Sequence, residues 1–177
     1  WRKGHLALRV DELRCQYDSL GLNEDINIQN VHIQNPSLII NQDSSFPLPI
    51  RKTRLPQTLL RALPFRFRVD HFFVTQGSLE FNLKDRNSEQ ASITFEAIDA
   101  EVSILQNTTD SLPALALKAS ALINARTALN MEAVYTYETS DPFTLKGEVG
   151  TTKLRFIDKF LRSAAGITVA SGQLDKM

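Results

Sequence analysis

The chain of 177 residues carries 20 basic and 20 acidic side chains, so its formal net charge is zero, and 42% of its residues are apolar. This length suits one domain with its own core, and the composition argues against both a dedicated nucleic-acid binder and a disordered chain. No apolar run is long enough for a membrane-spanning helix, and no signal segment opens the sequence. The single cysteine, Cys15, excludes an internal disulfide and is expected to be a small buried apolar residue.

Alternation of apolar and polar residues, the period of a β-strand with one dry face, dominates the sequence. The clearest example runs from Phe65 to Phe73, where apolar residues alternate with two arginines and an aspartate. Further strands are expected, in chain order, over 6–10, 13–17, 79–83, 93–95, 98–104, 115–123, 131–137 and 143–145. Changes of parity at Asp11–Glu12 and Ala97–Ile98 are typical of β-bulges, which curve a sheet.

Two segments have the pattern of a helix. The first, Pro56–Leu63, begins with proline in its first turn and is stopped by Pro64. The second, Lys153–Ala165, repeats apolar residues on one face, with Thr152 as its expected N-cap and Gly166 as its expected C-terminal stop.

A short motif occurs three times, at 33–39, 74–80 and 169–175. Each copy has an aliphatic residue, then a break with glycine or proline, then leucine two residues after that break. We interpret the motif as a strand, a break and a second strand, so three copies predict a sheet extended by repeated hairpins. No strand follows the third copy, and we therefore expect the chain to be a piece of a longer protein.

The sequence contains none of the common catalytic or nucleotide-binding motifs. His5, His32 and His71 lie far apart in the chain and are expected to be half-buried strand residues rather than metal ligands. Asp99 and Glu101 share one strand face and are typical of surface charge. We therefore expect no enzyme activity, no catalytic residue, no metal and no cofactor.

Six basic residues fall within 18 positions that contain no acid: Arg51, Lys52, Arg54, Arg61, Arg66 and Arg68. Such a stretch either contacts phosphate groups or forms a solvated face beside an apolar one. Nucleic acid is disfavoured as the partner, because Phe65 and Phe67 alternate to the opposite strand face and cannot stack beside the arginines.

The apolar strand faces exceed what one substantial helix and one short helix can cover. Either the sheet folds on itself, or a curved sheet leaves a hydrophobic trough. Long strands, bulges and few chain breakers favour the trough. We predict a mainly β fold with two helices (α+β), in which a curved, largely antiparallel sheet of about 8–10 strands forms an open groove or half-barrel; a closed β-sandwich is the alternative.

Three stretches resemble a known family: 63–81 (Leu-Pro-Phe-Arg-Phe-Arg-Val-Asp-His-Phe-Phe-Val-Thr-Gln-Gly-Ser-Leu-Glu-Phe), the strand break at Asn35–Pro36, and 143–150 leading through a helix to 167–175. They are similar to the AsmA-like envelope proteins of Gram-negative bacteria, particularly the large versions found in Bacteroidetes. That family is related in architecture to TamB and to the eukaryotic bridge-like lipid-transfer proteins.

The resemblance implies a periplasmic protein of outer-membrane biogenesis, anchored in the inner membrane, whose long β-groove shields or conducts phospholipid acyl chains. It implies a single β-groove domain over 1–177, a membrane anchor outside these residues, and phospholipid acyl chains and other envelope proteins as partners. By alternation, the expected groove lining is Phe65, Phe67, Val69, Phe73, Leu79, Phe81, Leu83, Ile93, Phe95, Val102, Ile104, Leu115 and Leu117. The six basic residues are candidates for headgroup contact. The alternative function is a structural or assembly module that binds a protein partner through its sheet edges.

Overall fold

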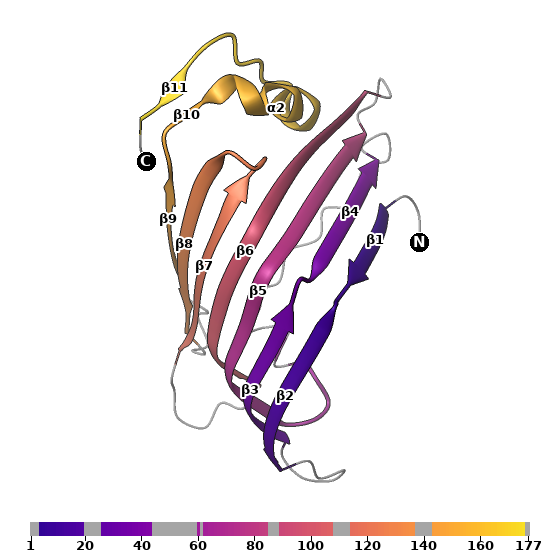
Figure 1. The fold of residues 1–177 in the computed structure, drawn as a ribbon, viewed down its shortest axis with the longest axis vertical. Helices are drawn as coiled ribbons and strands as arrows, with labels where there is room; N and C mark the ends of the chain where they lie inside the picture. The colour runs from indigo at the N-terminus through magenta and orange to yellow at the C-terminus, as the bar shows by residue number, and fades with distance from the viewer. Residues whose placement is uncertain are drawn as a thin grey trace.

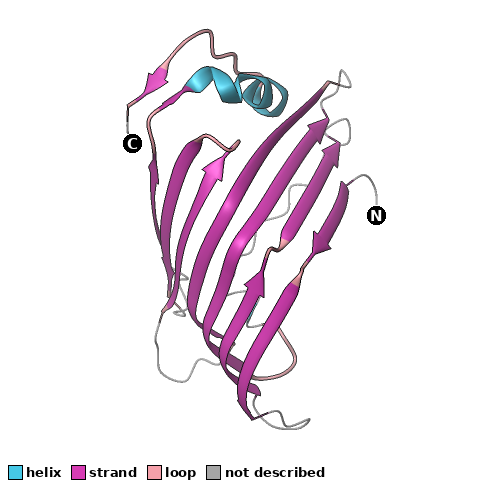
Figure 2. Ribbon diagram, viewed as in Figure 1, coloured by secondary structure: helices cyan, strands magenta, loops and turns pink. Residues whose placement is uncertain are grey.

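The computed structural model describes residues 4–19, 26–43, 60, 62–84, 89–107, 114–136 and 143–175. Over these residues the chain forms one curved, mostly antiparallel sheet, a small two-stranded sheet and one helical segment (Figures 1 and 2). The large sheet is not closed into a barrel. The predicted mainly β fold with a groove-like sheet is therefore confirmed, and the closed sandwich is wrong for the part of the chain described.

The strands are β1 (Gly4–Arg9), β2 (Glu12–Ser19), β3 (Ile26–Gln34), β4 (Ser37–Asp43), β5 (Phe67–Lys84), β6 (Gln90–Gln106), β7 (Leu115–Ile123), β8 (Thr127–Tyr135), β9 (Phe143–Val149), β10 (Thr152–Lys153) and β11 (Gln173–Leu174). The helical segment is a 3-10 turn, η1 (Leu154–Ile157), followed by α2 (Asp158–Ala165). With 18 and 17 residues, β5 and β6 confirm the prediction of long strands.

The large sheet has two edges, formed by β1 with β2 on one side and by β9 on the other. β1 pairs with β4 and β2 pairs with β3. β3 and β4 therefore lie end to end along β5, and β1 and β2 lie end to end along the edge of the sheet. β3 and β4 run parallel to β5, and every later neighbour is antiparallel, from β5 through β9 (Figure 1).

The first two copies of the repeated motif pair with each other, since Ile33 lies opposite Val74 and the strands continue in register on both sides of the break. The predicted hairpins are therefore wrong. Asn35 and Gln76 adopt positive φ angles of 49° and 55°, which kink the chain at the same level without reversing it. In the third copy, the residues after the break form β11, which pairs with β10.

β-Bulges interrupt β5 and β6 where the strands bend. The predicted bulge at Ala97–Ile98 is confirmed by a φ of 48° at Ala97 and by a register shift against β7. The bulge in β5 places Thr75 and Gln76 against Asp99, whose carboxylate accepts a hydrogen bond from the Gln76 amide at 3.0 Å. After each inserted residue, the odd-numbered and even-numbered residues of the strand exchange faces.

The predicted helix at 153–165 is confirmed in position, but its first turn is 3-10. Thr152 is not its N-cap: it lies in β10, and its hydroxyl accepts a hydrogen bond from buried Thr127 at 2.7 Å. Gly166, with a φ of 69°, ends the helix as expected. The helix predicted at Pro56–Leu63 lies mostly outside the described residues.

Helix α2 lies at the upper end of the sheet, beside the part of β6 that precedes Phe95 and has no β7 partner (Figure 1). Phe160 packs edge-to-face against Phe81, with ring centroids 5.9 Å apart. Leu83 and Ala91 are buried at this end of the sheet.

Candidate functional site: the apolar face of the sheet

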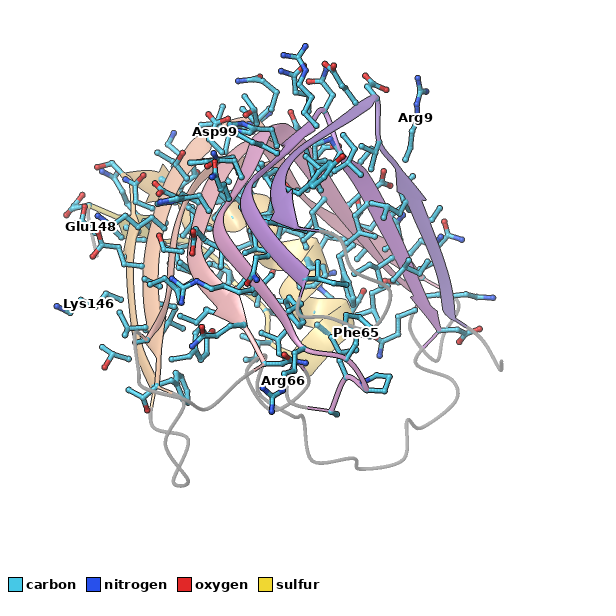
Figure 3. All side chains as sticks on the ribbon, turned by 90° about the horizontal axis from the view of Figure 1, so that it is seen from below. Arg9, Phe65, Arg66, Asp99, Lys146 and Glu148 are labelled. Atoms are coloured by element: carbon cyan, nitrogen blue, oxygen red, sulfur yellow. The ribbon has the colours of Figure 1, made fainter. Side chains whose placement is uncertain are left out.

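Strand pairing assigns each residue of the large sheet to one of two faces, because paired residues point to the same side. We call the side that carries Phe81 the apolar face and the other side the polar face. The apolar face includes Leu6, Leu8, Leu13, Val31, Ile33, Leu38, Ile40, Phe72, Val74, Leu79, Phe81, Leu83, Ile93, Phe95, Val102, Leu115, Leu117, Leu129, Met131, Tyr135, Phe143, Leu145 and Val149. On the polar face, Glu101, Lys118, Glu132 and Lys146 form one row across β6 to β9. Figure 3 shows Asp99, Lys146 and Glu148 pointing outward, so the apolar face lines the inside of the curve.

The apolar face is open to solvent at both rims. On β1 and β2, the residues Leu6, Leu8 and Leu13 are 66%, 63% and 63% exposed. On β9, Phe143 and Leu145 are 52% and 55% exposed. Large apolar side chains that share one face and remain this exposed are typical of a surface that contacts an apolar partner.

The buried core is small for the surface area that the chain exposes. The chain exposes 12302 Å². A compact monomer of 19.9 kDa is expected to expose about 8,700 Å². Within the described residues, only six hydrophobic side chains belong to the buried core: Val31, Val69, Leu83, Ala91, Leu115 and Ala133.

Most of the predicted lining residues share the apolar face: Leu79, Phe81, Leu83, Ile93, Phe95, Val102, Ile104, Leu115 and Leu117. Phe67, Val69 and Phe73 point to the polar face instead, because the bulge at Gln76 reverses the parity of β5. Phe65 precedes β5 and is exposed. The sheet thus brings together the predicted lining on β6, β7 and the part of β5 after its bulge, and it separates the part of β5 before the bulge.

Contacts of Phe73 confirm that it belongs to the polar face. Its ring stacks on His32 at a centroid distance of 4.6 Å and on His71 at 5.8 Å. The Nδ1 of His71 lies 3.2 Å from Glu101, which belongs to the charged row of that face. The side chain of His71 is 49% exposed, in agreement with the expected half-buried strand residue. His32 is exposed, so the expectation is wrong there, and the side chain of His5 lies outside the described residues.

The sequence reasoning missed the lower part of the apolar face. There, Phe72 and Val74 on β5 adjoin Val31 and Ile33 on β3. The alternation of 65–73 predicts Phe73 and the other odd-numbered residues as lining, and so leaves out Phe72 and Val74. The adjacent pair Phe72–Phe73 is the signal that both faces are apolar at this level.

The lower end of the apolar face carries polar side chains, which we call the polar end: Asn27, Arg68, Asp70 and Gln106. Arg68 donates from Nε to Asp70 Oδ1 at 2.7 Å and from a terminal nitrogen to Gln106 Oε1 at 3.2 Å. The Arg68 and Asp70 side chains are 43% and 42% exposed.

Among the other basic residues considered for headgroup contact, Arg66 is exposed just before β5. The remaining four, Arg51, Lys52, Arg54 and Arg61, lie outside the described residues. The structure therefore places one candidate, Arg68, on the apolar face itself.

The polar face carries a hollow of about 1120 Å³ that crosses β5 to β9. Its walls are two neighbouring rows of this face, one containing Glu101 and Lys118 and the other containing Asp99 and Ser120. Within the described residues, no group of three or more histidine, cysteine or acidic side chains is placed to hold a metal ion.

Cys15 is exposed, so the expectation of a buried residue is wrong. It lies opposite Val31 on the apolar face, and β2 has no neighbour on its outer side among the described strands. An edge strand cannot bury its side chains without a cover over that face.

None of the described helices has both the length and the apolar character needed to cross a membrane. No family model matches the chain, and no curated protein or solved structure shows significant similarity to it. The arguments about function therefore depend on the apolar face and its polar end.

Proposed function

We propose that the chain shields or conducts phospholipid acyl chains along the apolar face of its curved sheet. The observation that carries the proposal is the set of exposed apolar side chains on the inside of the curve at the two rims of the sheet, on β1 and β2 and on β9. Each methylene that moves from water onto such a surface contributes about 0.8 kcal/mol, so partial coverage of one acyl chain is already favourable.

The dimensions of the apolar face suit a lipid that lies along the strands. From Phe72 to Phe81 the strand β5 spans about 30 Å at roughly 3.3 Å per residue. One leaflet of a bilayer is about 15 Å deep, half of the roughly 30 Å hydrocarbon core. An extended acyl chain therefore fits within the length of the face.

The resemblance to the AsmA-like envelope proteins supports the same proposal. It extends the proposal to a β-groove segment of a longer periplasmic protein that is anchored in the inner membrane and acts in outer-membrane biogenesis. In this proposal the chain performs no chemistry on the lipid, because acyl chains need only an apolar surface.

The test is native mass spectrometry of the purified chain after incubation with phospholipid vesicles. The double variant Leu8→Glu with Leu145→Glu places two charges on the rims of the apolar face, where both side chains are already exposed. We expect the lipid-bound fraction to fall at least fivefold, because each carboxylate disfavours an adjoining acyl chain.

The matched control is Leu122→Glu with Val134→Glu. These side chains are also exposed and lie on β7 and β8, but they point to the polar face. We expect this control to retain lipid, with circular dichroism showing β structure for both double variants. A wild-type chain that binds no lipid, or two double variants that lose lipid equally, contradicts the proposal.

The alternative is an assembly module that binds a protein partner through a sheet edge. The observation that favours it is β9, whose residues from Phe143 to Glu148 are all exposed along an unpaired edge. Lys146, however, is the kind of charged edge residue that discourages added strands. Lys146→Pro is expected to abolish partner binding under this alternative and to leave lipid binding unchanged under the first.

A further inference from the structure

The polar end of the apolar face holds the ion pair of Arg68 with Asp70. From β3 to β9, the described residues that the pairing places on the apolar face include only two charged side chains, Arg68 and Asp70. They point to the same side as Phe72, the first large apolar residue above them on β5. The face therefore has two opposite charges at one end of a long apolar surface. This arrangement matches a ligand with a charged headgroup and an apolar tail.

We propose that the polar end binds the headgroup of a zwitterionic phospholipid, with its phosphate at Arg68 and its ammonium group at Asp70. This inference rests on the proposed function, since the acyl chains would extend from Phe72 toward Phe81. Arginine is suited to phosphate because its guanidinium has five N–H donors in a planar fork. Two of these donors bind Asp70 and Gln106, and the two hydrogen bonds orient the guanidinium group of Arg68.

The side chain of Asp70 gives the site its selectivity. A lone arginine would favour any phosphate-containing lipid, and most strongly one with a net negative charge. The Asp70 carboxylate, 2.7 Å from Arg68, repels a net anion and attracts an ammonium group. Two opposite charges side by side thus match the paired phosphate and ammonium of a zwitterionic headgroup better than an anionic headgroup.

The exposed fractions of Arg68 and Asp70 make the ion pair accessible to a headgroup and determine how strong the headgroup preference is. Arg68 and Asp70 are less than half exposed, so they are partly shielded from water and still reachable by a ligand. Charge contacts at such positions are modest. We expect a two- to fivefold preference for one headgroup over another, not an exclusive choice.

The test is competition between phosphatidylethanolamine and phosphatidylglycerol in equimolar mixed vesicles, read as the ratio of the two bound lipids by native mass spectrometry. The wild-type chain is expected to retain phosphatidylethanolamine at least twofold over phosphatidylglycerol. Asp70→Asn leaves Arg68 uncompensated and is expected to reverse the ratio. Arg68→Gln is expected to lower the retention of both phospholipids relative to an uncharged diacylglycerol.

The matched control is the ion pair of Arg14 with Glu12, which has the same spacing and a similar distance of 2.6 Å but lies on the polar face. Glu12→Gln and Arg14→Gln are expected to leave the ratio unchanged. If all variants bind both lipids in the wild-type ratio, the headgroup inference is wrong while the lipid-binding function stands. If the wild-type chain binds neither phospholipid nor diacylglycerol, the proposed function fails as well.

Discussion

Gly77 is the residue on which the central kink of the sheet depends. It lies in β5 directly after the bulge at Gln76, where three neighbours leave no room for a side chain. A Cβ atom there would lie 3.0 Å from Val74 Cγ1 and 3.3 Å from both Ile98 Cβ and Pro36 Cγ. A β-branched valine, a β-branched isoleucine and a proline ring are stiff neighbours, and they must move by a few tenths of an ångström to admit a methyl group.

We expect Gly77→Ala to reduce the free energy of unfolding by about 1–3 kcal/mol, the usual cost of overpacking. The measurement is urea unfolding followed by circular dichroism. Gly147→Ala is the matched control, because its nearest neighbour would be Asn130 O at 3.7 Å. That control is expected to change stability by less than about 1 kcal/mol. Equal effects of the two substitutions would falsify the close-packing role of Gly77.

At the scale of an element, Asp158 in α2 binds the segment after the helix through the backbone amide of Val169. Its carboxylate accepts a hydrogen bond from the Val169 amide at 2.6 Å and contacts Arg162 at 2.5 Å. The hydrogen bond from the Val169 amide is the main cause that lowers the pKa of Asp158. Partial desolvation raises this pKa, and Arg162 lowers it further. A carboxyl group with a lowered pKa in the folded state stabilises that state when ionised.

The direction of the pH dependence follows from that lowered pKa. The stabilisation is fully present above the pKa of an unfolded aspartate, about 3.9, and is lost as the pH falls through the lower folded pKa. We therefore expect Asp158→Asn to lower the melting temperature at pH 7 and the gap to the wild type to close on acidification below about pH 4. Glu132→Gln, which removes a contact of only 4.0 Å to Lys118, should show little gap at any pH. A gap that is constant down to pH 2 would contradict the proposed role of Asp158.

The elements also show why the face assignment could be predicted only in part. Alternation predicted the other strands of the large sheet but not β3 and β4, and it assigned Leu79, Phe81 and Leu83 to one face. It failed at Phe67 and Phe73, because the bulge at 75–76 adds one residue to β5 and so reverses the parity before it. The sequence contains no certain mark of this bulge, since Gln76 adopts a positive φ without being glycine or asparagine.

At the scale of the whole molecule, the apolar area predicts either a sheet folded on itself or an open trough, and the long strands, bulges and few chain breakers favour the trough. The sequence has more apolar strand surface than its helices can cover, and the rims of the sheet are exposed as that argument requires. The strand order could not be predicted. β3 and β4 run parallel to β5 rather than in hairpins, and a pairing between strands so far apart in the chain leaves no local sequence pattern.

The same open shape makes Cys15 a reporter of lipid binding. It is the only cysteine of the chain, it is exposed, and it lies on the apolar face beside Leu13. If acyl chains cover that face, they must slow the reaction of this thiol with a water-soluble maleimide. We expect phospholipid vesicles to reduce the labelling rate at least threefold, and the variant Leu8→Glu with Leu145→Glu to show little protection.

Cys15→Ser with Gln16→Cys moves the thiol to the polar face, opposite Asn30, and should label at the same rate with and without vesicles. Equal protection of both positions would indicate that vesicles merely obstruct the reagent at the β2 edge, and protection of neither would mean that lipid does not reach this rim of the face.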